Sequence, residues 1–166
     1  ETETHIKEQE EVVDNYEDKL GSYLVKLAGH KLDMEEANEV TTLLHVIGDV
    51  ERISDHALNL VEAAKEMHKK EQSFSAKALE ELHIFSKAIA DIVALSVSIF
   101  ENEDAVAARQ IEPFEEAIDV IQKEMKKRHT KRLRKGKCTV EMGFVLSDVT
   151  NNYERIADHC SNIAIS

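Results

Sequence analysis

A nine-residue motif occurs twice in this chain, and no other feature of the sequence constrains the fold as strongly. The first copy spans residues 51–59 and the second spans residues 154–162, an offset of 103 (154 minus 51), with six of the nine positions identical. Internal similarity at a fixed offset indicates two copies of one structural unit. We therefore predict two tandem repeats, with residues 1–103 in the first and residues 104–166 in a second, partial one.

The composition predicts that both repeats are helical. One Pro, five Gly and no Trp occur in a chain that is 42% hydrophobic and 33% charged, a balance that favours helices over strands. Apolar side chains in the second expected helix recur every three or four residues, which is typical of a bundle helix. They are Val46, Val50, Ile53, Ala57, Leu60, Ala64 and Met67. We predict an all-α fold of two tandem three-helix bundles, of which the second is incomplete.

Helix-ending and helix-capping residues divide the chain into five expected helices. Gly29 and Gly136 tolerate the left-handed closing conformation, and Asp33 and Asp104 are good N-caps. Pro113 lacks a backbone donor and is expected to kink the fourth helix. The expected helices span residues 6–28, 34–70, 75–101, 105–134 and 139–166.

The charge distribution argues against one class of partner. A formal net charge of −12 disfavours nucleic-acid binding, which requires a basic face. One basic stretch is the exception, and it is compatible with a membrane surface, a phosphate or an acidic partner. The alternative is a solvated helix end whose cations are favoured near the C-terminal dipole. The stretch contains Lys126, Lys127, Arg128, Lys131, Arg132, Arg134, Lys135 and Lys137.

Two cysteines and the lack of a long apolar run bear on the compartment. Cys138 and Cys160 form no disulfide framework, so a reducing cytosol is expected. No run approaches the roughly 20 apolar residues of a membrane span. The chain starts at Glu1 without Met and stops within a helical pattern, and we interpret it as a fragment of a longer protein.

Paired carboxylates are the candidate site. Acids four residues apart share one face of a helix, and Glu51 lies within about 40° of Ile47 and Leu58, at the edge of an apolar arc. In an antiparallel hairpin the numbers of two facing residues add to a constant. If the acid pairs of neighbouring helices face each other, this sum is 65 in the first repeat and 273 in the second, and half of each sum falls at a predicted turn. Each repeat would then gather four carboxylates. They are Glu10, Asp14, Glu51 and Asp55, and Glu115, Asp119, Glu154 and Asp158.

Four grouped carboxylates repel one another unless they are protonated or neutralised by a cation. Oxygen-rich clusters suit iron, manganese, magnesium and calcium, and helical bundles with facing carboxylates hold such metals. The alternative is a set of exposed acids paired with Arg52, Arg155 and lysines. His56 and His159 point about 100° away from the adjacent Asp, so we expect them on the surface or in contact with another element. Asn59 and Asn162 are expected to orient Asp55 and Asp158, respectively.

The two motif copies, ERISDHALNL and ERIADHCSNI, resemble the E(D)xxxD signature of the PhoU family. The resemblance implies two helical bundles, multinuclear clusters of iron or zinc, and a role in regulating phosphate uptake. Carried over by position, it implies that the eight acids above hold the metals. It also implies one of two settings, namely stand-alone regulators or soluble domains of bacterial sodium/phosphate cotransporters.

We predict the second setting, a metal-binding domain on the cytoplasmic side of the bacterial inner membrane, with iron, manganese or zinc bound. Its expected partner is a phosphate transporter or the membrane domain of one, with phosphate and a second copy of the chain as further candidates. The first alternative is a stand-alone phosphate-uptake regulator. The others are a carboxylate-bridged metalloenzyme and a purely structural adaptor. Because the motif helices lack Glu-x-x-His in register and no nucleophile constellation occurs, we expect no enzyme.

Overall fold

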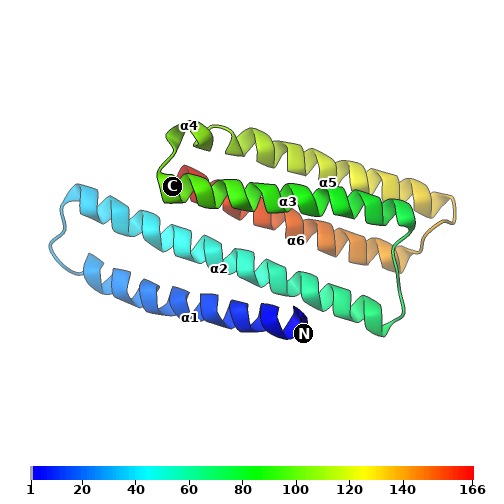
Figure 1. Ribbon diagram of the computed structural model, residues 1–166, viewed down its shortest axis with the longest axis horizontal. Helices are drawn as coiled ribbons and strands as arrows, with labels where there is room; N and C mark the ends of the chain where they lie inside the picture. Colours follow the sequence, from blue (N-terminus) through cyan, green and yellow to red (C-terminus); the bar gives the residue numbers. More distant parts are fainter. Residues whose placement is uncertain (1) are drawn as a thin grey trace.

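The computed structural model describes residues 2–166, and its regular structure is entirely helical, which confirms the predicted all-α class. Figure 1 shows long helices lying side by side, with the α1–α2 hairpin on one side of α6 and the helices α3 and α5 on the other. The helices are α1 (Thr2–Ala28), α2 (Met34–Lys69), α3 (Ala76–Asn102), α4 (Ala105–Ala108), α5 (Ile111–Arg134) and α6 (Val140–Ile165).

Side-chain caps begin the helices where the sequence predicts them. The Asp33 carboxylate accepts hydrogen bonds from the backbone N–H groups of Glu35 and Glu36, and Glu36 Oε2 accepts from the Asp33 N–H at 2.9 Å. This reciprocal capping box satisfies donors that a helix N-terminus leaves unpaired. Ser75 caps α3 and Thr139 caps α6 in the simpler one-bond form.

The expected kink at Pro113 does not form. The chain instead breaks at Arg109 and Gln110, between the short helix α4 and α5, and α5 begins at Ile111. Pro113 is therefore the third residue of α5, in the first turn, where a backbone N–H has no partner within the helix. A proline costs no helical hydrogen bond at that position, so the helix continues straight past it.

The hydrophobic core lies among α3, α5 and α6. Phe85, Ile92 and Ile111 are fully buried there, and the Phe85 ring meets Tyr153 edge-on with ring centroids 5.4 Å apart. The Ser96 hydroxyl donates to the Cys160 carbonyl at 2.9 Å, which fixes α3 against α6. Burial raises the pKa of the Cys160 thiol to about 12, so this cysteine is an apolar core residue.

The grouping of the helices differs from the expected division at residue 103. That division places α3 with α1 and α2, whereas α3 packs on α5 and α6 and completes a three-helix bundle with them. The α1–α2 hairpin joins this bundle through the packing of α2 on α6. The motif repeat lies only in α2 and α6, so it identifies equivalent helices without specifying which hairpin α3 covers.

Helix α3 is more apolar than expected from the sequence, in which no run was judged long enough to span a membrane. By length and composition α3 could cross a membrane, although core helices of soluble bundles have the same properties. One face of α3 is buried, at Phe85, Ile89 and Ile92 among others, while Ile84 and Val97, on either side of that face, are exposed. The inward face belongs to the bundle core, while only 28% of the most apolar stretch of α3 is buried within the structure.

Candidate metal centre

The carboxylates of the second repeat face one another between α5 and α6, as the hairpin arithmetic predicts. Burial raises the pKa of Glu115 above its usual value, and the negative charges of Asp158 and Asp119 raise it further. The pKa of Glu154 is raised by burial first and by Asp158 next. Charge repulsion of this kind acts only over short distances in water. Glu115, Asp119, Glu154 and Asp158 therefore lie close enough to affect one another's charge, and they are called here the α5–α6 carboxylate cluster.

Only two cations contact this cluster within residues 2–166. Lys123 Nζ donates to Asp119 Oδ2 at 2.7 Å, and Arg155 lies 3.7 Å from Asp158 and 3.9 Å from Glu154. Both cationic side chains are more than half exposed, so these ion pairs contribute little. Burial still raises the pKa of Asp158 despite the opposing effect of Arg155. The cluster is thus incompletely neutralised by the protein itself.

The chemistry of the cluster fits a metal ion. Its donors are all carboxylate oxygens, which hard cations such as manganese and iron prefer, and burial first and neighbouring carboxylates second raise the pKa values of Glu115 and Glu154. No group of three or more Asp, Glu, His or Cys side chains in residues 2–166 is already arranged to hold a metal. Metal binding would therefore require rotation of these half-exposed side chains.

The first repeat is aligned differently from the prediction. Lys65 Nζ donates to Glu3 Oε1 at 2.7 Å, and Gly21 lies against Ile47, so facing residue numbers in α1 and α2 add to 68. The hairpin arithmetic predicted 65. These two contacts are displaced by three positions from the predicted pairing, although the turn itself, residues 29–33, lies where the sequence predicts it.

This shift brings Glu17 to the first carboxylate pair. The pKa of Glu51 is raised by burial first, then by Asp55, and also by the charge of Glu17. Glu10 is half-buried and Asp14 is exposed, and no hydrogen bond or ion pair within residues 2–166 joins either side chain to Glu51 or Asp55. Sequence reasoning missed Glu17, although Glu3, Glu10 and Glu17 recur every seven residues and so share one face of α1.

A polar network connects α2 to α6 beside these carboxylates. His56 Nδ1 lies 2.9 Å from Asn152 Oδ1, and His159 Nδ1 lies 2.8 Å from Asp49 Oδ1. The two imidazole rings stack with their centroids 5.6 Å apart and their planes 22° apart. Because His159 and Asn152 follow His56 and Asp49 by 103 residues each, the network has approximate two-fold symmetry.

The network confirms one expectation for the motif and changes another. Both histidines contact another element, as expected. The motif asparagines do not bond to Asp55 and Asp158, because Asn59 Nδ2 donates to Asn152 Oδ1 at 3.3 Å and Asn162 Nδ2 donates to Asp49 Oδ1 at 3.4 Å. Sequence reasoning missed Asp49 and Asn152 because they differ in type, although the offset of 103 aligns them.

Two comparisons with known proteins agree with these features. The family model for the PhoU domain matches residues 4–64 and 82–166. The second matched segment contains most of α3 with α5 and α6, which is the grouping seen in the packing. The chain is also 24% identical over 160 residues, 95% of its length, to the phosphate-specific transport system accessory protein PhoU homolog 1 of Thermotoga maritima, of which the match covers 68%.

Proposed function

The chain belongs to the PhoU domain family, and from this premise we propose that it regulates phosphate transport as an accessory protein, without turnover of its own. The observation that carries the proposal is the family match across both repeats. The named relative is a transport-system accessory protein, which favours this reading over a soluble domain of a sodium/phosphate cotransporter. On this proposal the partner is a phosphate transport system, and the protein acts at the cytoplasmic side of its membrane.

We further propose that the α5–α6 carboxylate cluster holds iron, manganese or zinc. A bound cation would supply the positive charge that Lys123 and Arg155 provide only in part, and it would tie α5 to α6. Glu51, Asp55 and Glu17, with Glu10 and Asp14 nearby on α1, are the corresponding candidate ligands of the first repeat. Metal occupancy would then set how firmly each hairpin is held, and therefore which surface the protein offers to its partner.

An apolar face of α1 suits contact with such a partner. Tyr16 and Tyr23 are each 62% exposed, and Val12 and Leu20 beside them are also exposed. These exposed apolar side chains recur every three or four residues and so share one face of the helix. A contiguous exposed apolar patch is typical of a contact surface. We propose that the transport system covers it.

Phosphate uptake in bacterial cells tests the function. Cells that lack their own PhoU-family regulator would express the full-length protein, and uptake of radiolabelled phosphate would be measured in phosphate-rich medium. We expect uptake to fall relative to cells carrying an empty vector. Uptake that stays at the empty-vector value, with the protein shown to be folded and abundant, would overturn the proposed regulation.

A paired variant tests the contact surface in the same cells. Replacing Tyr16 and Tyr23 by Ser should abolish the restraint of uptake. The matched control replaces Ile84 and Val97, exposed apolar residues of α3, by Ser and should leave the restraint intact. Equal loss in both variants would indicate general destabilisation and would contradict a specific role for α1.

A further inference from the structure

A basic pocket lies at the end of the bundle where α3 begins and α5 ends. Its volume is about 380 Å³, and it is lined by Ser75, Lys77, Lys131, Arg132, Lys135 and Lys137 among others. Five of these six side chains are cationic, and within residues 2–166 no carboxylate is among the lining side chains, in a chain whose net charge is −12. Such a local reversal of charge attracts anions.

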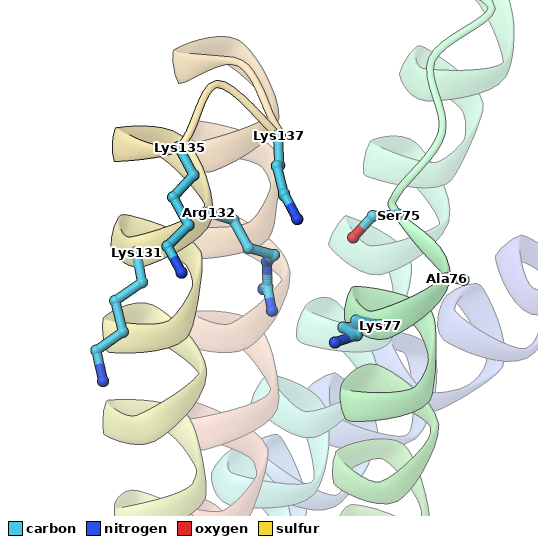
Figure 2. Close-up of a pocket in the computed structure, with 7 residues that line it drawn as sticks. All are labelled: Ser75, Ala76, Lys77, Lys131, Arg132, Lys135 and Lys137. Atoms are coloured by element: carbon cyan, nitrogen blue, oxygen red, sulfur yellow. The ribbon is translucent and has the colours of Figure 1, made fainter.

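The cations that line the pocket come from the start of α3, the end of α5 and the turn after α5. Figure 2 shows Ser75 and Lys77 at the start of α3 facing Arg132, Lys135 and Lys137 across the gap, with Lys131 at the outer edge. Within residues 2–166 none of the four lysines forms an ion pair. Their charges are therefore available to a ligand.

Arg132 has an unused donor at this pocket. Its side chain is only 13% exposed, and Nη1 donates to both carboxylate oxygens of Glu81 at 2.9 and 3.0 Å. Nη2 is buried and has no hydrogen-bond partner within the described part of the chain. A buried donor without a partner is costly and calls for an acceptor that the protein does not itself supply. An oxyanion in the pocket would become such an acceptor if the guanidinium turned to present Nη2, which solvent does not reach in this conformation.

The favourable effect of a helix C-terminus on cations accounts for the basic residues of α5 but not for Lys77 on α3. Lys131 and Arg132 lie in the last turn of α5, where cations are favoured in any case. Lys77 lies in the first turn of α3, at the positive end of that dipole, and this turn contains no acid. A cation there is unfavourable by itself, whereas an anion bound between Lys77 and the α3 N-terminus would be favoured by both.

We propose that this pocket binds a phosphoryl group, either free as inorganic phosphate or pyrophosphate or carried on a lipid headgroup. A phosphoryl group offers several oxygen acceptors and up to two negative charges, which matches a guanidinium and four ammonium groups better than a carboxylate does. The Ser75 hydroxyl supplies a neutral polar group at the same wall. The site is built from residues outside both carboxylate pairs, so it stands apart from the proposed metal binding.

Calorimetric titration of the purified protein with inorganic phosphate and pyrophosphate, at constant ionic strength, tests the free-ligand form. Flotation with vesicles of phosphatidylcholine, with and without phosphatidic acid, tests the headgroup form. The test variant is Lys135→Gln with Lys137→Gln. The matched control is Lys19→Gln with Lys31→Gln, which removes the same charge from exposed positions in α1 and its turn. Circular dichroism melting would establish that both variants fold.

Binding of pyrophosphate or phosphate that weakens at least about tenfold in the test variant and is unchanged in the control would support the free-ligand form, since the test variant removes two charge-assisted contacts. Binding only to phosphatidic acid vesicles, with the same variant pattern, would support the headgroup form. No binding in either arm, or equal weakening in both variants, would overturn the site. Because no transporter is needed, these results are independent of the uptake test.

Discussion

His159 on α6 lies 2.8 Å from Asp49 on α2, and the equivalent residues of the other repeat copy, His56 on α2 and Asn152 on α6, form the same contact at 2.9 Å. One half of this near-symmetric network thus carries an acid and the other half an amide. Asp49 is 6% exposed and also lies 3.6 Å from Arg52, so its charge is held between His159 and Arg52. The network fixes the register of α2 against α6, and with it the relative position of the two repeats.

Replacing Asp49 by Ala should destabilise the protein by about 1–3 kcal/mol, because it leaves His159 and Asn162 facing a buried site without an acceptor. Urea unfolding followed by circular dichroism measures this change. Asp49→Asn is the matched control, since it keeps an oxygen acceptor and reproduces the residue found at position 152. We expect it to cost less than Asp49→Ala. Equal losses in the two variants would show that the hydrogen bond to His159 contributes nothing.

The α5–α6 carboxylate cluster predicts a pH dependence for the metal-free protein. The pKa values of Glu115 and Glu154 are raised in the folded chain, so folding favours their protonated forms. Their contribution to stability is present below the ordinary value of 4.5 and is lost as the pH rises through the raised pKa values. The thermal midpoint should therefore fall as the pH is raised from 4.5 towards neutrality.

Glu115→Gln with Glu154→Gln should flatten that slope, because amides do not titrate. The general acidity of the chain acts in the same direction, so the control must remove equal charge elsewhere. Glu8→Gln with Glu11→Gln does so at exposed positions of α1. Thermal melting monitored by circular dichroism across this pH range compares the three proteins. Identical slopes for the two double variants would exclude a special role for the cluster.

Metal content can be measured directly. Protein purified without chelator or nickel should contain iron, manganese or zinc near stoichiometry by plasma mass spectrometry, and Glu154→Gln with Asp158→Asn should lose the share bound at α5–α6. Glu51→Gln with Asp55→Asn should lose the share of the first repeat. Absence of metal from the wild-type protein, before and after reconstitution, would leave both carboxylate groups as solvated acids.

The two hairpins show how far the sequence determines this site. For α5 and α6, Gly136 marks the turn closely, so the facing pairs Glu115 with Asp158 and Asp119 with Glu154 could be predicted. Between α1 and α2 the segment from Gly29 to Asp33 is as long as the one between α5 and α6, residues 135–139, so its length does not set the register. Acidic residues recur along α1, so several alignments of α1 with α2 bring an acid close to Glu51. The sequence alone does not distinguish these alignments, which is why Glu17 was missed.

That shift in register gives a separate prediction. Glu17→Gln should lower the raised pKa of Glu51, because it removes a negative charge that contributes to the raised value. Asp14→Asn, one turn away and exposed, should change it less. Carboxyl carbon chemical shifts followed by NMR over a pH titration measure both. A larger effect of Asp14 would restore the alignment expected from the sequence and contradict the contacts of Lys65 and Gly21.

The position of α3 was the other feature that the sequence left open, because its apolar face would serve equally well against either hairpin. Its packing against α5 and α6 predicts that Ile92→Ala, at a side chain with no exposed surface, costs about 2–5 kcal/mol. Ile84→Ala removes the same atoms from an exposed position of the same helix and should change stability by no more than about 0.5 kcal/mol.

Stability alone does not identify the neighbours of Ile92, so amide chemical shifts of the Ile92→Ala variant complete the test. We expect the perturbed amides to lie in α5 and α6, around Ile118 and Cys160, because these residues belong to the same buried cluster. Perturbations centred instead on α1 would place α3 against the first hairpin. Such a result would support the division at residue 103. The basic pocket would then lack the residues that α3 contributes to it.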